Sequence, residues 1–409
     1  MVFFEDALKT VLSQNVHPVA ERVELSDSLG RILFENIFSD MDMPPFDKSA
    51  VDGFACRLED MNVPLTGEQN FLHGLTWAQN IVPLQMIETI PAGKIPQKTI
   101  LPGQCSKIMT GAMVPTGADC VVMVEDTETP FENVVRINRQ SAAKNICFRG
   151  EDIKNGEKVL HKGLQIAPAH IAVLAAMGTN KPQVARLPRV GIISTGDELV
   201  EPGVTPGAAQ IRNSNAWQLE AQVKTVPALP QYHGIVPDEG PELRKIIDTA
   251  LAGNDVVLLT GGVSMGDFDF VPAIMQEAGV EILFKSIAIQ PGKPTVFGRR
   301  DNTYIFGLPG NPVSSFVLFE MMVRPFLKMM MGCSMTPLTL SLPMGVDFFR
   351  RKSVRKSMIP VVIKDGAVYP VEYHGSAHIN AYTLANGIMA MEIGATSLNK
   401  GEQVYVRPI

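Results

Sequence analysis

The segment Val190-Gly191-Ile192-Ile193-Ser194-Thr195-Gly196-Asp197-Glu198 decides the fold. Its β-branched run, residues 190–194, ends in a glycine and two carboxylates, which is typical of a strand followed by a loop. The runs 255–260 and 303–308 end similarly, in Gly261-Gly262 and in Pro309-Gly310. Apolar residues at helical spacing lie between these runs. Alternating strands and helices with short loops predict a doubly wound parallel sheet, covered on both faces, over residues 188–331.

Other elements are expected inside this α/β domain. We predict strands at 234–236 and 282–289, and helices at 217–223, 243–251 and 271–278. Asn213-Ser214-Asn215 can cap the first of these helices. A methionine-rich helix begins at Val313, and Pro325 should kink it because proline has no N–H to donate.

The rest of the chain divides into three parts. Residues 1–40 together with 149–187 are predicted to form a split helical N-terminal domain, interrupted by an inserted β-rich domain at 41–148. Residues 332–409 alternate strictly in places and contain the hairpin signal Asp365-Gly366, which predicts a β-barrel-like C-terminal domain. Helices in the split domain are expected at 7–12, at 31–33 behind a cap at Asp27 or Ser28, and at 168–177. The fold class is therefore a multidomain α/β protein.

Composition excludes several classes of protein. The chain has 409 residues, a net charge of -6 and 45% hydrophobic residues, which excludes a disordered chain. Residues 163–180 are the longest uncharged stretch, but Pro168 and His170 lie inside it, so a buried helix is expected rather than a membrane span. The acidic start does not match a secretory signal. We therefore expect a cytoplasmic protein with no membrane segment.

Cysteine spacing and charge exclude further classes. Five widely spaced cysteines without a CxxC pair predict neither a disulfide framework nor a zinc cluster, but small core side chains. Mild acidity indicates no nucleic-acid partner, and a basic run such as residues 350–356 is usually a solvated face. Walker A, GxGxxG and HExxH patterns are absent from the sequence, which excludes the usual kinases, dehydrogenases and zincins.

Loops that follow parallel strands are the expected place for a ligand. Gly261 and Gly262 let backbone N–H groups approach an anion, which indicates a phosphate cradle, although two glycines after a strand also form plain turns. Glu198 and Asp269 follow two strands and would bind magnesium together with a substrate phosphate, with helix capping as the alternative for Asp269. Lys293, in a loop after another strand, would bring an ammonium group to the same rim.

Six motifs in order resemble one family. The matching stretches are Pro44-Pro45-Phe46-Asp47-Lys48-Ser49-Ala50-Val51-Asp52-Gly53, Ile108-Met109-Thr110-Gly111-Ala112, Arg149-Gly150-Glu151-Asp152-Ile153, Ser194-Thr195-Gly196-Asp197-Glu198-Leu199, Gly261-Gly262-Val263-Ser264, and Leu308-Pro309-Gly310-Asn311-Pro312-Val313-Ser314. The chain resembles the molybdopterin molybdenumtransferases, the family that includes bacterial MoeA and the E domain of gephyrin.

This resemblance implies a molybdopterin-binding sheet domain and a homodimer whose site lies between subunits. The implied reaction takes molybdate and adenylylated molybdopterin as substrates, releases AMP with the help of Mg2+, and leaves molybdenum on the dithiolene. The implied protein partners are the molybdopterin adenylyltransferase and the recipient molybdoenzymes. Neither nucleic acid nor a membrane is implied.

The resemblance also implies roles for individual residues. Asp52, Thr110 and Asp152 would face a site completed by the sheet domain of the partner, where Glu198, Asp238 and Asp269 sit at strand ends. Under this hypothesis Glu198 and Asp269 bind Mg2+ and position the pterin phosphate, while Asp52 and Thr110 organise the attacking or metal-bearing end. The residues expected to bind the cofactor are Gly261, Gly262, Ser264, Lys293, Pro309, Pro312, Arg355 and Ser376.

One departure from the family pattern leaves the choice of oxyanion open. Some members carry lysines where this chain has Ser286 and Gln290, although Lys285 and Lys293 are nearby. Losing ammonium groups weakens the attraction for a dianion, so both molybdate and tungstate stay possible. Two other functions are also open: a non-catalytic molybdopterin-binding scaffold, and a nicotinamide-nucleotide hydrolase that shares the same sheet domain.

Overall fold

A computed structural model describes most of the chain. The described residues are 1–62, 71–72, 75–76, 81–138, 143–237, 240–263, 271–334, 336–351, 354–373, 375 and 377–409. They form two compact units. Unit 1 comprises Met1–Glu35, Lys162–Ala172 and Thr179–Ile409, and unit 2 comprises Asn36–His161 and Val173–Gly178. The division into four domains at the boundaries given above stays a prediction.

A six-stranded sheet forms the centre of unit 1, in the order β18-β15-β19-β23-β22-β20. Its strands are β15 (Arg189–Thr195), β18 (Leu229–Val236), β19 (Val256–Thr260), β20 (Glu281–Phe284), β22 (Val296–Arg300) and β23 (Thr303–Leu308). Strands β18, β15, β19 and β23 run parallel, which confirms the parallel arrangement for this part of the sheet. Strands β22 and β20 are antiparallel, so the edge of the sheet differs from the prediction.

The prediction of one strand at 282–289 was wrong. Strand β20 ends at Phe284, and Ile289–Gln290 forms a separate strand, β21, which pairs with β26 (Lys356–Lys364) in a different sheet. The apolar residues on both sides of Lys285-Ser286 are buried, but in two different sheets. A hydrophobic pattern reports burial and does not report which sheet provides it.

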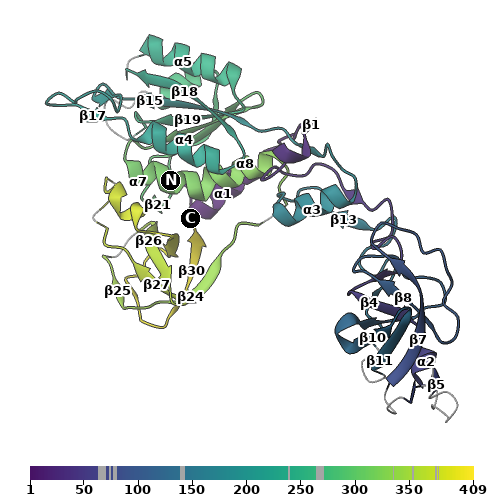
Figure 1. Ribbon diagram of the computed structural model, residues 1–409. Coiled ribbons are helices and arrows are strands. Elements are labelled where there is room, and N and C mark those ends of the chain that lie inside the picture. Colours follow the sequence, from purple (N-terminus) through teal and green to yellow (C-terminus); the bar gives the residue numbers. More distant parts are fainter. Residues whose placement is uncertain are drawn as a thin grey trace. The chain divides into compact units, whose positions relative to one another are not determined.

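Helices cover both faces of the sheet, as predicted. Along β15 and β19 alternate residues contribute to two separate cores, because successive side chains of a strand point to opposite faces. Helix α5 (Gly240–Gly253) and helix α6 (Val271–Glu277) cover one core. The other core is covered by α1 (Phe4–Leu12), α4 (Asn215–Thr225), α7 (Pro312–Leu318) and α8 (Arg324–Met330). Figure 1 shows the sheet between α5 and α4.

The helix that begins after Asn311 is interrupted just before Pro325. Helices α7 and α8 are separated by a π-helical turn, Phe319–Val323, in which the N–H of Arg324 donates to the carbonyl of Phe319. Proline at residue 325 has no N–H, so the regular ladder cannot continue through this point. The interruption lies where the sequence predicts a kink.

The second helix expected near the N-terminus was wrong. Residues Leu25–Asp27 form one 3-10 turn, Gly30 has a φ of 78°, and Ile32 forms a β-bridge to Gln165. A left-handed glycine ends helical geometry, and the bridges then satisfy the backbone. Helix α1 confirms the helix expected at 7–12, and α3 (Pro168–Ala176) matches the one at 168–177. The short strands β1 (Ala20–Arg22) and β14 (Gln183–Ala185) form an antiparallel pair.

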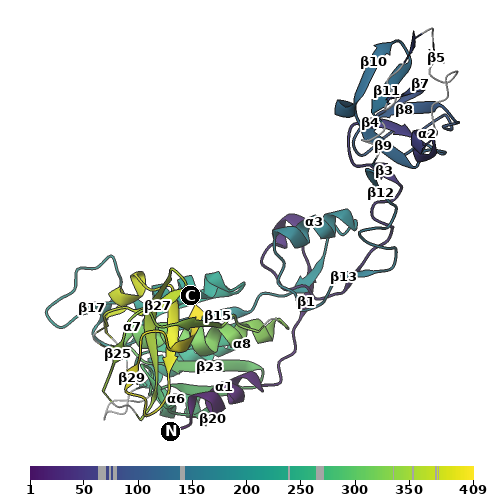
Figure 2. The same ribbon diagram turned by 90° about the horizontal axis from the view of Figure 1, so that it is seen from below.

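Unit 2 is rich in β-strands, as predicted for the insertion. Its six-stranded sheet has the order β10-β11-β7-β8-β4-β9 and is visible in Figure 2. The strands are β4 (Gly53–Cys56), β7 (Ile81–Ile90), β8 (Gln104–Ile108), β9 (Cys120–Met123), β10 (Thr127–Phe131) and β11 (Val134–Asn138). Smaller elements are α2 (Leu58–Asn62) and the pairs β2 (Ile37–Phe38) with β13 (Lys158–Leu160), β3 (Lys48–Ser49) with β12 (Ile146–Cys147), and β5 (Phe71–Leu72) with β6 (Leu75–Thr76).

The C-terminal residues form a further sheet of unit 1, with the order β21-β26-β28-β30-β24. Its other strands are β24 (Leu340–Pro343), β27 (Ala367–Pro370), β28 (Gly387–Met391) and β30 (Gln403–Pro408), and beside it β25 (Phe348–Phe349) pairs with β29 (Ser397–Leu398). The predicted hairpin at Asp365-Gly366 is confirmed: Lys364 pairs with Ala367, and both turn residues have positive φ.

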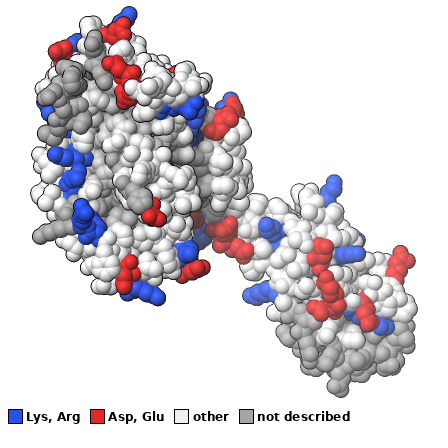
Figure 3. Space-filling view, turned by 90° about the vertical axis from the view of Figure 1, so that its left-hand side faces the viewer, with Lys and Arg blue, Asp and Glu red and all other residues white. Residues whose placement is uncertain are grey.

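Several surface and core expectations can be compared with the structure. Three of the five cysteines, Cys56, Cys105 and Cys120, are buried as expected of small core side chains, whereas Cys147 and Cys333 are only partly buried. The basic run at 350–356 is only partly a solvated face, because Arg350 donates to the carbonyls of Glu392 and Ala395. Acidic and basic side chains are interspersed on the face in Figure 3. In the described ranges, no helix combines the length and the apolar character needed to cross a membrane.

Phe297 is the centre of an aromatic cluster in unit 1. Its ring lies 4.7 Å from Phe306 and 6.0 Å from Phe326, centroid to centroid, and its side chain is fully buried. Phe297→Ala should therefore lower the free energy of unfolding by about 3–5 kcal/mol, through lost burial and a residual cavity. Urea denaturation of the variant measures this loss. Phe349→Ala, at a residue that is 71% exposed, is the control and should change the midpoint little.

Candidate functional site

A cavity of about 640 Å³ lies in unit 1 at the carboxyl ends of β15, β19 and β23. Thr195 ends β15, Thr260 ends β19, and Pro309 follows β23, and all three residues line the cavity. Because the three strands are parallel, their carboxyl ends open at one edge of the sheet. The cavity therefore occupies the place where an α/β sheet is expected to bind a ligand.

Glycine is required at the floor of this cavity. Gly261 has a φ of 103° and Gly262 has a φ of 60°, both in the region that favours glycine. A Cβ at residue 261 would lie 2.1 Å from the carbonyl oxygen of Thr195, and a Cβ at Gly310 would lie 3.7 Å from the Cα of Gly261. The loops after all three strands thus approach one another backbone to backbone, and the N–H of Gly261 donates to the carbonyl of Leu308 at 3.1 Å.

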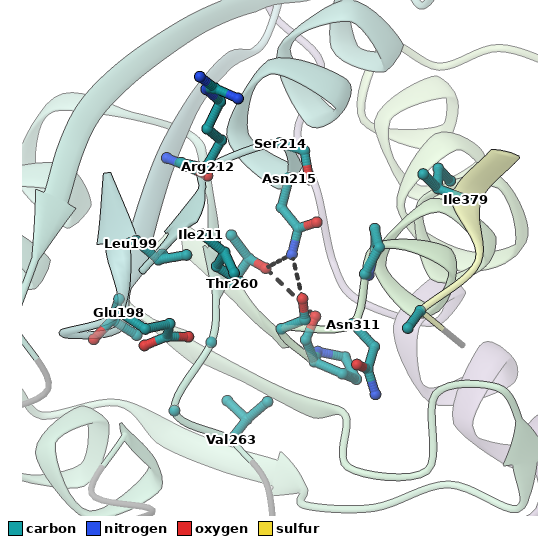
Figure 4. A pocket seen from close by; sticks show the side chains of 18 of the residues that line it. Glu198, Leu199, Ile211, Arg212, Ser214, Asn215, Thr260, Val263, Asn311 and Ile379 are labelled. Atoms are coloured by element: carbon teal, nitrogen blue, oxygen red, sulfur yellow. Dashed lines mark hydrogen bonds between the residues drawn. The ribbon is translucent and has the colours of Figure 1, made fainter. Parts of the chain in front are cut away.

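A buried amide ties two of these loops together. The Nδ2 of Asn215 donates to the Oγ1 of Thr260 at 2.9 Å and to the carbonyl of Gly310 at 2.8 Å. The Thr260 hydroxyl lies 3.4 Å from the carbonyl of Pro309. Figure 4 shows this group between Glu198 on one side and Ile379 on the other. Asn215 is the first residue of α4, so the helix is joined to both the β19 and the β23 loops.

A second polar network contacts the first turn of α4 through Asn213, the residue two positions before the helix begins. The Oδ1 of Asn213 accepts from the Ala216 N–H at 3.3 Å, and its Nδ2 donates to the Tyr232 hydroxyl at 2.8 Å. Tyr232 in turn donates to Glu201 at 2.7 Å. Burial raises the pKa of the Tyr232 hydroxyl, and the neighbouring Glu201 carboxylate raises it further. The hydroxyl stays protonated, so Asn213 is held by a neutral donor and acceptor.

Few charged side chains line the cavity. Among the described lining residues, the carboxylate is that of Glu198, which is exposed, and the cation is Arg212. The described parts of the chain contain no group of three or more His, Cys, Asp or Glu side chains that could hold a metal ion by themselves. Four predicted site residues lie outside the described residues: Asp238, Ser264, Asp269 and Ser376.

Two predicted cation contacts do not line this cavity. Lys293 is half-buried next to Pro294, and the cavity is lined by Pro294 rather than by the lysine. Arg355 is described but is also not a lining residue. The Nζ of Lys285 lies 3.4 Å from Gln276 on α6. In contrast, the structure brings together Glu198, Gly261, Gly262, Pro309 and Pro312, which the sequence predicts as site residues.

Two other predicted site residues are paired within unit 2. Asp52 precedes β4, Thr110 follows β8, and the β4–β8 register places Gly53 opposite Ile108. The Oδ1 of Asp52 accepts from the Thr110 N–H at 2.6 Å and from its hydroxyl at 2.8 Å. These two hydrogen bonds hold the pKa of Asp52 below its ordinary value. Both residues are exposed, so the ionised carboxylate is accessible to solvent.

Asp152 has a simpler environment in the same unit. It is exposed, and its N–H donates to the carbonyl of Met43 at 3.1 Å. Nearby, Arg149 donates through Nε to Asp42 at 2.6 Å, which ties the loop to the segment before the Pro44-Pro45 motif. The backbone therefore presents the Asp152 side chain at the surface of unit 2.

Sequence reasoning missed the amide residues of the site. Asn213 and Asn215 were interpreted as helix caps, and the Asn213 contact with Ala216 confirms part of that interpretation. Their second function, the contacts to Tyr232, Thr260 and Gly310, depends on segments that are distant in sequence. One feature of the sequence could have indicated this function: two asparagines begin a helix in a domain whose ligands are expected at the loops after its parallel strands.

The fold and the cavity define a multidomain α/β protein with a small-molecule site at the strand ends of its sheet. Comparisons with known proteins agree. Residues 2–178 match the MoeA N-terminal region (domain I and II), residues 191–329 match a probable molybdopterin binding domain, and residues 343–409 match the MoeA C-terminal region (domain IV).

Named relatives extend over nearly the whole chain. The molybdopterin molybdenumtransferase of Staphylococcus epidermidis is 36% identical over 411 residues, 98% of this chain and 94% of that protein. That of Bacillus subtilis is 38% identical over 79% of this chain and 74% of its own length. A MoeA crystal structure from Pyrococcus horikoshii OT3 has a TM-score of 0.83 at 29% identity and covers 100% of both chains. The chain belongs to the molybdopterin molybdenumtransferase family.

The glycine at residue 261 can be tested directly. Gly261→Ala should displace the loop from Thr195 and lower the free energy of unfolding by about 1–3 kcal/mol, because a side chain there is both strained and crowded. Differential scanning calorimetry measures the loss. Gly203→Ala is the matched control, since a Cβ at that residue meets nothing within 4 Å. Equal melting temperatures for the two variants would contradict the close approach described here.

The Asp52–Thr110 pair also makes a measurable prediction. Thr110→Val removes the hydroxyl donor but keeps the N–H donor, which is the larger cause of the lowered pKa. The pKa of Asp52 should therefore rise in the variant while staying below its ordinary value. An NMR titration of the side-chain carboxyl carbon measures both parts of this result. A pKa that does not change would show that the hydroxyl bond is absent in solution.

Proposed function

We propose that this chain inserts molybdenum into molybdopterin during molybdenum cofactor biosynthesis. Its substrates would be molybdate and adenylylated molybdopterin, and cleavage of the phosphoanhydride would release AMP and leave molybdenum on the dithiolene sulfurs. The observation that carries this proposal is the glycine-lined cavity at the ends of β15, β19 and β23, in a chain 36% identical to a molybdopterin molybdenumtransferase along nearly its whole length.

The cavity fits a phosphate-bearing pterin in size and chemistry. A volume of about 640 Å³ is within the range of small-molecule sites. The backbone N–H of Gly262 would bind a phosphate oxygen, because that of Gly261 already donates to the carbonyl of Leu308. The amide network around Asn215 would keep this loop in place without reorganisation. Preorganised donors of this kind stabilise negative charge that develops on a leaving phosphate.

The acidic residues fit a magnesium ion held jointly with the substrate. Mg2+ is commonly bound through one or two carboxylates together with substrate phosphates. Glu198 is an exposed carboxylate on the cavity wall and would be one ligand, and Asp269 is the proposed second. When bound, the ion would neutralise phosphate charge. The described lining residues include few charged side chains, as expected for a magnesium site in which the substrate phosphate supplies some of the ligands.

We also propose that the active enzyme is a homodimer in which Asp52, Thr110 and Asp152 act on substrate held by the other copy. The exposed Asp52 carboxylate and its Thr110 partner support this, because they form a preorganised polar pair at the surface of unit 2. They would orient the metal-bearing end of the substrate by position and charge. The molybdopterin adenylyltransferase and recipient molybdoenzymes are the proposed protein partners, and the cytoplasm is the proposed location.

An assay of both products tests the proposed reaction. Wild-type protein with molybdate, Mg2+ and adenylylated molybdopterin should release AMP and form molybdenum cofactor in equal amounts. Glu198→Gln should lower both rates at least about a hundredfold, because a charge-stabilising group is lost. Glu242→Gln, at an exposed residue on α5, is the control. Tight binding of the substrate by wild-type protein without AMP release would instead favour a non-catalytic scaffold.

Mixed dimers test whether two copies share each site. Asp52→Asn and Glu198→Gln should each inactivate their homodimers. Co-expression of the two variants should restore about a quarter of wild-type activity, because half of the dimers are mixed and each mixed dimer has one intact site. If each site used both residues from one copy, mixed dimers would contain no intact site, and activity would stay at the level of the single variants.

A further inference from the structure

A second cavity, of about 360 Å³, lies in unit 1 beside the π-helical turn that separates α7 from α8. It shares no lining residue with the cavity at the strand ends. Three cationic side chains line it, those of Arg324, Lys328 and Arg407, together with the carboxylate of Glu320. The side chains of the described lining therefore carry an excess of two positive charges, and Ile409, the last residue, also lines the cavity.

The single carboxylate is already saturated. Glu320 is 4% exposed. Its two oxygens accept from Arg324, Nε at 2.6 Å and Nη2 at 2.8 Å, and the Nε2 of Gln222 donates to it at 2.8 Å. Arg324 and Glu320 thus form a closed, bidentate pair. The remaining positive charge of the cavity belongs to Arg407 and Lys328.

Arg407 makes its backbone hydrogen bond through one guanidinium nitrogen, Nη1. In the π-helical turn the carbonyl of Glu320 would need a donor at residue 325, which is proline and has no N–H. The Nη1 of Arg407 fills this position and donates to the Glu320 carbonyl at 2.9 Å. No carboxylate in the described ranges lies within 4.0 Å of Arg407 or of Lys328. Burial lowers the pKa of Arg407, and the charge of Glu320 only partly opposes this effect.

Most of the rest of the wall is apolar, apart from Thr225, whose hydroxyl accepts from the Nη2 of Arg324 at 2.8 Å. Pro337, Leu338 and Pro408 line the cavity. The side chain of Leu338 is 65% exposed, although the same cavity contains the Glu320–Arg324 ion pair. Ligand sites typically combine such apolar walls with a few placed polar groups. We propose that this cavity binds a small organic anion, in which a carboxylate or phosphate group meets Arg407 and Lys328 and a compact apolar body lies against Leu338 and the prolines.

Calorimetric titration of the full-length protein with four probes separates charge from apolar contact. Phenyl phosphate and benzoate each carry a negative charge and an apolar ring, and comparing them shows whether phosphate or carboxylate is preferred. Inorganic phosphate carries the charge alone, and benzyl alcohol carries the ring alone. The proposal expects at least one of the two aromatic anions to bind at least about tenfold more tightly than either single-feature probe, since a charge-assisted hydrogen bond and ring burial each contribute on this scale.

Variants assign the binding to this cavity. Lys328→Met and Arg407→Met should each weaken binding of the preferred aromatic anion several-fold, to about tenfold for the arginine. Lys364→Met is the matched control, because it removes one positive charge from the C-terminal part of the chain. Lys364 lies over the Tyr369 ring and does not line the cavity. Lys328 makes only a 3.4 Å contact with Gln165, so its variant keeps the test valid if Arg407→Met fails to fold.

Three outcomes would overturn the proposal. The first is no heat of binding with any probe. The second is equal affinity in wild type, Lys328→Met and Lys364→Met, which would place the binding elsewhere. The third is seen by analytical ultracentrifugation, if the wild-type protein is a dimer and the Leu338→Ser variant is a monomer. A second copy would then cover the cavity. Cofactor formation by Lys328→Met should match wild type, which separates this site from the proposed catalytic one.

Discussion

The registration of three parallel strands is the constraint on which the site depends. Residue 260 of β19 pairs with residue 194 of β15 and with residue 308 of β23, so the three chains leave the sheet at the same level. The carbonyl of Thr195 then faces the Cα of Gly261, and any side chain there would collide with it. A shift of one strand by a single residue would reverse its side chains between the two cores, so burial on both faces fixes the register.

Buried amides convert this registration into a rigid site. Backbone carbonyls at the ends of loops lack ladder partners, and a buried unpaired polar group costs about 1–3 kcal/mol. Asn215 satisfies the carbonyl of Gly310 and the hydroxyl of Thr260 together, and Asn213 links α4 to Tyr232. The same contacts that remove this cost also hold the β19 and β23 loops together at a fixed spacing. Stability and ligand binding therefore use one set of hydrogen bonds.

The sequence allowed prediction of features that depend on local pattern. The alternation of strands and helices, the glycines at 261 and 262, Glu198 at a strand end and the turn at Asp365-Gly366 each have a local signal. The features it did not reveal depend on partners distant in the chain. The wrong helix near Ile32 has apolar spacing, but Gly30 and the bridge to Gln165 favour an extended chain. The amide contacts of Asn215 join residues separated by 45 and 95 positions.

The strand at 282–289 was wrong for a reason that bears on the site. After Phe284 the chain leaves the central sheet, and Ile289 and Gln290 pair with Lys356 and Ser357 of the C-terminal sheet. This exchange of one segment between two sheets fixes Pro294 at the cavity, and Ala377 and Ile379 of the C-terminal part line the same cavity. The cavity wall is therefore built by the strand ends of the central sheet together with residues of the C-terminal part of unit 1. Ser286 and Gln290 lie on the exchanged segment and are not among the described residues that line the cavity, so a substitution at either residue leaves the glycine loops of its floor unchanged.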